Sequence, residues 1–409
     1  MSEKSQTPPA TAIPPQSNQG FSASDKCVLL EILETATLTQ EPLSERFEAA
    51  LAKSVEAQFA VVFASGTAAL HAAVHVSGLK PDEDAITSPI SFVDSANAIL
   101  YNDGHPIFAD INPESGQITA ATIAHILTRK TKVIIPVDLC GRPSELAAIQ
   151  ELARKHEIVV IQNAAHSLGA RYKTRHKGKD VWAPVGSCYH ADMCCFSLAE
   201  GGAVTTNNQD YYDRLIRFRE HGITKNPTEF QHQRFAGRSW YSEQQELGFN
   251  YQLNDWSCAR GLSQLKTLNE EVCLRARMAA RYRDQLADDV EFLRGDDAFH
   301  KSTHHLAPIL VDPALRDVIF EQLRSFGIGV QLHYIPIYRH PYYQKIFGGL
   351  NTDHTPHAES YFRSAISLPI YPQLTDDELM RVIEAVKLSI NKAREKAHIP
   401  SWGEAAPTP

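Results

Sequence analysis

The feature that most constrains the fold is a repeated alternation of short apolar runs with segments of helical spacing. The apolar runs cover residues 59–63, 84–90, 106–111, 132–137 and 158–161, and the segments with helical spacing cover 44–58, 68–76, 119–127 and 144–156. Strands that are apolar almost throughout are buried on both faces, which is typical of parallel sheets covered by helices. The sequence therefore predicts an α/β fold with a mainly parallel sheet.

The pattern changes in the last third of the chain. Helices are expected at 262–274, 276–286, 314–326 and 376–392, with strands at 307–310 and 330–334. These elements predict a smaller α+β domain. We expect a disordered tail at 1–20, a large domain at 21–265, the small domain at 266–398 and a disordered end at 399–409.

Charge and cysteine content exclude several classes of protein. The net charge of −8 argues against nucleic acid or an anionic membrane as partner, and no apolar run approaches the ~20 residues of a membrane span. The first 20 residues lack the apolar core of a signal peptide. Seven scattered cysteines do not form a disulfide framework, and adjacent Cys194 and Cys195 should point to opposite faces of a strand as small hydrophobic residues. We expect a cytoplasmic protein without a metal site.

Several short motifs follow strands and can hold a cofactor. Ser65, Gly66 and Thr67 open a helix, whose first N–H groups suit a phosphate. Phe92 can stack on a ring, and Asn163 begins a polar segment after the strand 158–161. Taken singly, each signal is weak, because the same residues occur as helix caps, core residues and turn residues. A hairpin of strands 194–198 and 203–207 is predicted, with Glu200-Gly201-Gly202 as its turn.

In combination, the motifs resemble the DegT/StrS-type sugar aminotransferases, which use pyridoxal 5′-phosphate (PLP). The family's Schiff-base hairpin reads D-M/V-x-x-F-S, then a lysine loop, then T-x-x-E-G-G-A-V-x-T-N, and residues 192–207 match both strands. Further similar segments are 162–170, 219–223, 245–255, 261–266, 331–338 and 367–369. They run in order between about Asp25 and Lys392.

The resemblance implies the fold, the activity and the site. It implies the type I fold of PLP-dependent transferases and transfer of an amino group, typically from glutamate, to C4 of a UDP-linked 4-keto-6-deoxy-N-acetylhexosamine for cell-surface glycans. It also implies a homodimer, because family sites are shared between subunits, with Asn250 reaching the neighbour's phosphate. The implied cofactor-binding residues are Gly66, Thr67, Phe92, Asn163, His166, Ser197 and Asn250, and the implied substrate-binding residues are His333, Tyr334 and Tyr338.

Three departures from the family pattern affect the chemistry. No lysine stands between Leu198 and Ala199, where the family has its catalytic residue, so no catalytic residue can be assigned. Asn163 stands where the family has the aspartate that keeps the ring nitrogen protonated, and Gln252 replaces an arginine. The lysine anchors the cofactor and moves a proton, and loss of a general base costs ~10²–10⁴ in rate. A neutral hydrogen bond contributes ~1 kcal/mol against ~1.5–3 for a charge-assisted one.

Three interpretations remain open. The natural chain can carry a short lysine loop that this sequence lacks, or the protein can be a pseudo-enzyme that binds a ligand or regulates an active subunit. It can also work on the pyridoxamine form, as family members with a histidine in place of the lysine do. Lys173, Lys177, Lys179 and Lys225 are expected at the surface and do not substitute. We predict a folded chain whose transamination is absent or severely weakened.

Overall fold

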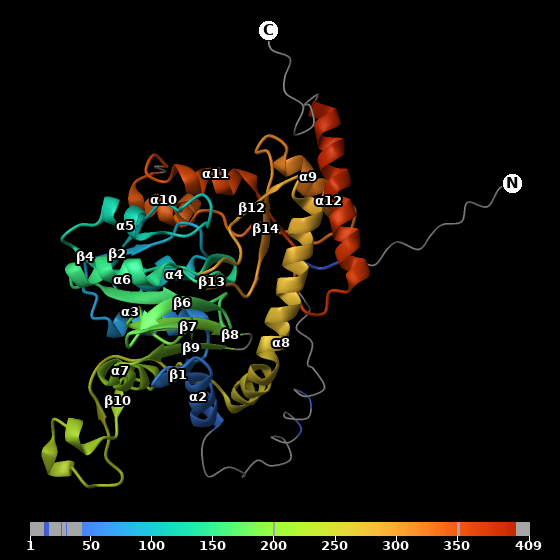
Figure 1. Cartoon of the computed structure of the whole chain (residues 1–409). Helices are drawn as coiled ribbons and strands as arrows, with labels where there is room; N and C mark the ends of the chain where they lie inside the picture. Colours follow the sequence, from blue (N-terminus) through green and yellow to red (C-terminus); the bar gives the residue numbers. More distant parts are fainter. Residues whose placement is uncertain are drawn as a thin grey trace.

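The centre of the molecule is a seven-stranded sheet of order β1-β9-β8-β5-β4-β2-β3 (Figure 1). The computed structural model describes residues 12–15, 26, 30, 43–198, 201–349 and 352–397. The strands are β1 (Phe59–Phe63), β2 (Asp84–Thr87), β3 (His105–Phe108), β4 (Thr131–Ile135), β5 (Val159–Asn163), β8 (Met193–Leu198) and β9 (Gly201–Thr206). Strands β3, β2, β4, β5 and β8 pair in parallel, and β9 is antiparallel to both β8 and β1. Only β9 therefore runs against the others, which confirms the predicted mainly parallel sheet.

Helices cover both faces of this sheet, as the apolar strands predict. One face packs against α3 (Gly66–Val76), α4 (Asp94–Leu100) and α7 (Gln209–Arg219), and the other against α2 (Leu43–Ser54), α5 (Ala120–Ile126), α6 (Leu146–Lys155) and the start of α8. Along β1, Val61 and Phe63 enter the first core, while Ala60 and Val62 enter the second. Cys194 and Cys195 likewise lie in different cores, so their predicted opposite orientation is confirmed.

The glycines of the hairpin are strand residues, and their predicted place in the turn is wrong. The β8–β9 ladder runs without interruption from Met193 opposite Thr206 to Leu198 opposite Gly201. Only two residues lie between the strands, and both are outside the described residues. A Cβ at Gly202 would lie 2.3 Å from the carbonyl oxygen of Ser65. Glycine is needed here because two backbones approach closely. In a sequence, a glycine required for close approach cannot be told from a glycine required for a turn.

The smaller α+β unit consists of a second sheet and long helices (Figure 1). Its elements are β12 (Glu291–Phe292), β14 (Ala307–Leu310), β15 (Ala365–Leu368), α9 (Arg316–Ser325), α12 (Asp376–Ala397) and the end of α8 (Asp255–Leu286). The predicted strand 330–334 is reduced to a bridge between Gln331 and Ser367. Helix α8 is one element of 32 residues, so the predicted break between 262–274 and 276–286 is wrong. Helix α8 also passes through the predicted domain boundary at 265/266. The division into domains stays a prediction.

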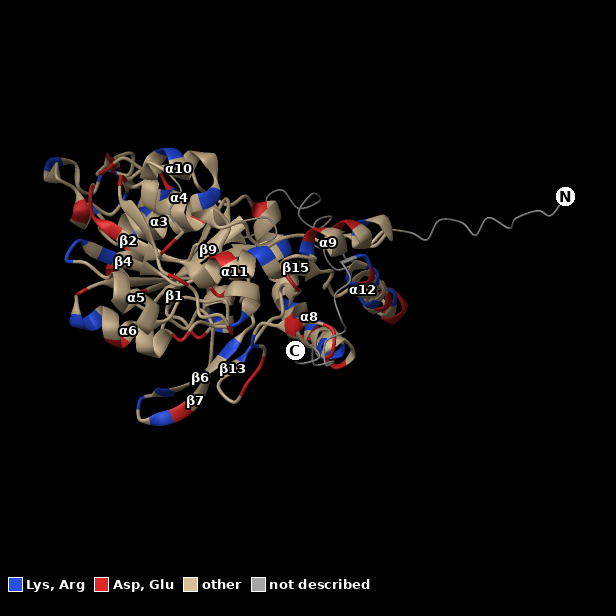
Figure 2. Ribbon diagram, turned by 90° about the horizontal axis from the view of Figure 1, so that it is seen from above, with Lys and Arg blue, Asp and Glu red and all other residues tan. Residues whose placement is uncertain are grey.

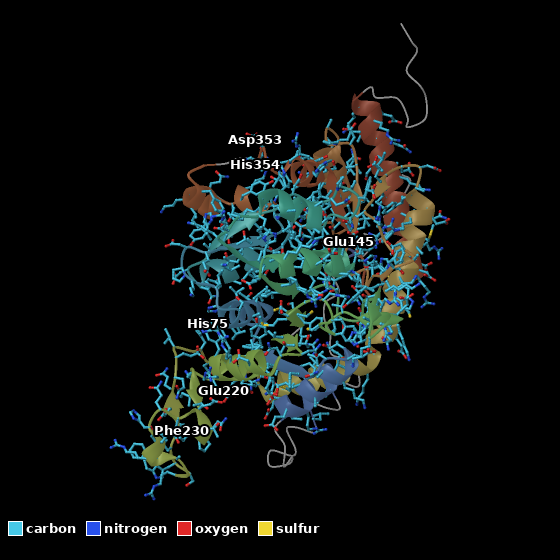
Figure 3. The ribbon with its side chains drawn as sticks, turned by 60° about the vertical axis from the view of Figure 1, so that its left-hand side comes forward. His75, Glu145, Glu220, Phe230, Asp353 and His354 are labelled. Atoms are coloured by element: carbon cyan, nitrogen blue, oxygen red, sulfur yellow. The ribbon has the colours of Figure 1, made fainter. Side chains whose placement is uncertain are left out.

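The remaining helices and strands are short elements in the segments that connect or extend these two units. They are η1 (Leu139–Gly141), β6 (Arg171–His176), β7 (Lys179–Pro184), β10 (Ile223–Thr224), η2 (Pro227–Glu229), η3 (Gln233–Phe235), β11 (Glu243–Gln244), β13 (His300–Lys301), η4 (Ile337–Arg339), α10 (Pro341–Phe347) and α11 (Pro356–Ser364). The segment between β10 and β11 forms an arm that projects from the body, and Figure 3 shows Phe230 on this arm. Lys173 and Lys179 lie in the β6–β7 hairpin and are exposed, as expected.

One part of the predicted N-terminal tail packs on the small unit. Ile13 is 1% exposed, and its N–H donates to the carbonyl of Gly327 at 2.8 Å. The other residues of the tail, and the predicted disordered end at 399–409, lie outside the described residues.

Charged residues of both signs alternate over the outer helices. Figure 2 shows Lys and Arg beside Asp and Glu along α8 and α12 and at the tip of the β6–β7 hairpin. In the described part of the chain, every helix is too short or too polar to cross a bilayer.

Candidate active site

The candidate site is a cavity of about 300 Å³ where the parallel strands end. It is lined by Ser91, Phe92, Asp94, Val137, Asn163, Ala165, His166, Ser197, Leu198, His305 and Tyr334. Most of the lining comes from the ends of, or the segments after, β2, β4, β5 and β8, because the carboxyl ends of parallel strands meet at one edge of the sheet. His305, before β14, and Tyr334, before η4, complete it. A larger hollow of about 600 Å³ lies beside α2 and α7, but none of the sequence-predicted site residues lines it.

Helix α3 begins at one corner of this cavity. The Ser65 hydroxyl caps the helix by accepting a hydrogen bond from the N–H of Ala68 at 3.1 Å. A Cβ at Gly66 would lie 2.9 Å from both Cβ and Oγ of Ser197. The missing side chain thus lets the first turn of α3, with its free N–H groups and positive dipole end, approach the hydroxyl of Ser197. This corner fits a phosphate group.

Asn163, at the end of β5, is held by the protein on both of its polar atoms. It is 3% exposed. Its Oδ1 accepts from the N–H of Ala165 at 3.1 Å, and its Nδ2 donates to Oγ of Ser95 at 2.9 Å. Ser95 is in turn 2.8 Å from the hydroxyl of Ser91. The carboxamide is therefore fixed toward α4 by neutral hydrogen bonds.

Aromatic and imidazole rings form another wall. His166 Nε2 lies 3.1 Å from the hydroxyl of Tyr334, and the His166 ring stacks on His305 with 4.7 Å between centroids. Buried Nδ1 of His166 has no partner among the described residues, so it is available to a polar group of a ligand. Burial lowers the pKa of His166 well below its usual value, and the neighbouring His305 and His333 lower it further. The ring is neutral at pH 7. Phe92, 58% exposed, stands at the mouth with its centroid 6.4 Å from that of Tyr334.

The histidines near the cavity give the protein a predicted loss of stability in mild acid. Burial lowers the pKa of both His305 and His333 to about 4, from about 6.5 in the unfolded chain. Between these values the unfolded state binds more protons, so stability is complete above about pH 6.5 and falls as the pH drops toward 4. Urea unfolding at pH 7.5 and pH 5 should show this fall, and His305→Gln should reduce it. The exposed His125→Gln is the control, and an equal effect of both variants would contradict the prediction.

Asp94 is a cavity residue that sequence reasoning missed. Among the described residues that line the cavity it is the only acid, and none of them is a lysine or arginine that could pair with it. Burial raises its pKa to about 6, against hydrogen bonds from Ser95 that lower it. A lone acid two residues after Phe92 forms no recognisable pattern, so the sequence alone offered no signal for it.

The structure brings five of the ten predicted site residues together in the cavity lining: Phe92, Asn163, His166, Ser197 and Tyr334. Gly66 and Thr67 adjoin it at the start of α3. The other three lie outside the lining: Asn250 is exposed, and His333 accepts through its carbonyl from the Tyr361 hydroxyl at 2.7 Å. Tyr338 is 6% exposed and donates to Glu359 at 3.0 Å.

Similarity to known proteins identifies the family of this chain. The model of the DegT/DnrJ/EryC1/StrS aminotransferase family matches residues 22–387. A UDP-4-amino-4,6-dideoxy-N-acetyl-β-L-altrosamine transaminase of Helicobacter pylori is 33% identical over 368 residues, which are 88% of this chain and 94% of that protein.

Solved structures give the same result. Helicobacter pylori PseC, an aminotransferase in pseudaminic acid biosynthesis, has a TM-score of 0.78 at 29% identity and covers 94% of this chain and 99% of its own. The PLP-form of the sugar aminotransferase Spr1654 from Streptococcus pneumoniae has a TM-score of 0.81 at 23% identity, covering 93% and 98%. The predicted fold class of PLP-dependent transferases is confirmed. The chain therefore belongs to the DegT/DnrJ/EryC1/StrS aminotransferase family.

Proposed function

We propose that this cavity binds pyridoxal 5′-phosphate without a covalent link, and that transamination by the chain as sequenced is absent or severely weakened. The observation that carries the proposal is the β8–β9 ladder, which is paired as far as Leu198 and Gly201 and leaves only two residues, neither of them lysine, between the strands. In the described part of the chain, no lysine lines the cavity either.

The residues of the cavity support binding of the cofactor more than its chemistry. The start of α3 and Ser197 offer the phosphate corner, Phe92 offers an aromatic face, and His166 offers an unpartnered Nδ1. When bound, the cofactor supplies an electron sink to an amino group. Without the lysine, the chain has no amine at the hairpin to hold the cofactor covalently or to move a proton.

We further propose the substrate class and the assembly. By similarity to the Helicobacter pylori transaminase, the ligands are a UDP-linked 4-keto-6-deoxy-N-acetylhexosamine and glutamate. A homodimer is supported by two surface features, exposed Asn250 and the arm between β10 and β11, on which Trp240 is 70% exposed. The six cysteines that the structure describes are unpaired, which is compatible with a cytoplasmic location.

A second candidate function is full sugar aminotransferase activity in a natural chain that carries the lysine loop. The unbroken β8–β9 ladder supports it, because a loop can join the ends of such a hairpin without altering the strands.

The deciding experiment is the intact mass of the protein from its own source, before and after addition of PLP and reduction with borohydride. If the native mass equals that of the 409 residues and no single-site pyridoxyl adduct forms, the proposal stands. A native mass larger by a short loop, together with an adduct, would establish the second candidate. Turnover at ordinary enzyme rates by the 409-residue chain would overturn the first.

A further inference from the structure

Asp94 has an unusual position for an acid. It lines the cavity at the first turn of α4, and in the described lining it has no cationic neighbour. A largely desolvated carboxylate that has hydrogen bonds from Ser95 but no cation to pair with is costly, and such groups collect at functional sites. A cation supplied by a ligand would remove this cost.

Asp94 also lies beside the residue that should hold the cofactor ring. Its chain neighbour Ser95 receives the hydrogen bond from Nδ2 of Asn163 at 2.9 Å. Cys195, which stands opposite Asn163 in the β5–β8 register, is also near Asp94. Burial first, then Cys188 and the Asp94 carboxylate, raise the pKa of the Cys195 thiol. The acid and the amide thus share one end of the cavity.

Asn163 cannot carry the charge that a protonated ring nitrogen requires. Its Oδ1 is engaged by the N–H of Ala165 at 3.1 Å and its Nδ2 by Ser95. A carboxamide is neutral and gives no charge-assisted bond. The single carboxylate in the described lining comes from α4, whereas the family pattern has it at the end of β5.

We propose that Asp94 replaces the missing aspartate and acts as the counter-charge to the protonated ring nitrogen of bound pyridoxal 5′-phosphate. The inference rests on the proposed function, since it assumes that the cofactor binds. Asp94 is a cofactor-positioning acid in this assignment, and Asn163 becomes a neutral spacer between β5 and α4.

The test uses the full chain and PLP labelled with ¹⁵N at the ring nitrogen. The wild-type complex should show the ¹⁵N signal of a protonated pyridine, measured beside the dissociation constant. Asp94→Asn should move the signal to the unprotonated position and weaken binding by about ten- to a hundredfold. The double variant D94N/N163D should restore both, because it returns the carboxylate to the end of β5.

The control is Asp210→Asn, which removes an acid from the first turn of a different helix, α7, outside the cavity lining. It should change neither readout. If Asp94→Asn does not fold, as judged by thermal melting without cofactor, Asp94→Ser replaces it. A protonated signal and an unchanged dissociation constant in a folded Asp94 variant would overturn the inference alone. Absence of PLP binding by the wild type would overturn the proposed function as well.

Discussion

Inserting a short loop with one lysine between Leu198 and Ala199 should give the chain a single borohydride-reducible pyridoxyl adduct. It should also raise transamination by about 10²–10⁴-fold, the usual contribution of a general base. The amine of the lysine both holds the cofactor covalently and carries the proton, and no other residue of the family site does both. The paired ends of β8 and β9 can accept the loop.

Mass spectrometry after reduction and a coupled assay with glutamate would measure the two effects. The matched control is the same loop with arginine in place of lysine, which keeps the length and charge and cannot form the adduct. Equal activity of the lysine and arginine loops would contradict the prediction. A gain with lysine alone would show that the rest of the cavity is still arranged for catalysis.

Replacing Glu48 by alanine should lower the free energy of unfolding by about 3 kcal/mol, the low end of the range for breaking a buried ion pair. The buried Arg219 guanidinium would lose its buried partner and keep Glu220, 3.0 Å away and 39% exposed, as its ion-pair partner. Arg219 Nη1 lies 2.6 Å from Oε1 of Glu48, and each side chain is 9% exposed. The same carboxylate oxygen accepts from the N–H of Val62 at 2.9 Å. Burial raises the pKa of Glu48, and the Arg219 guanidinium opposes this rise. The pair ties α2 and α7 to β1, which leads into the phosphate corner.

The control for this prediction is an exposed pair with similar geometry. Glu151 lies 2.9 Å from Lys155 on α6, but its side chain is 75% exposed, so Glu151→Ala should leave the free energy of unfolding nearly unchanged. Urea unfolding of both variants gives the comparison. Similar decreases in the free energy of unfolding of the two variants would show that burial of the Glu48–Arg219 pair contributes nothing to stability.

The short apolar strands were the most predictable part of the structure. The runs at Phe59–Phe63 and Ala307–Leu310 match β1 and β14 residue for residue, because apolar residues bounded by turn formers leave few alternatives. The β6–β7 hairpin was missed because its alternating residues, such as Arg171 and Lys173, are largely exposed and carry no apolar period. The continuity of α8 was missed because nothing in the sequence marks a helix that serves two cores.

The site was predictable only where a motif had a mechanism attached. Ser197, Asn163 and His166 sit in recognisable motifs after strands, and the structure places all three in one cavity. Asp94 entered the cavity through the packing of α4 onto the sheet, which is a tertiary effect. Gly202 was assigned to a turn because a sequence does not show that the Ser65 carbonyl lies where its side chain would be.

The 32-residue helix α8 has a consequence for how the molecule comes apart. Cys258 near its start is buried in the core beneath the main sheet, and Tyr282 near its end is buried in the core of the small unit. A rod of about 48 Å thus belongs to both cores at once. Neither core can unfold without unravelling a helix that the other core needs, so we expect the two units to unfold in one cooperative transition.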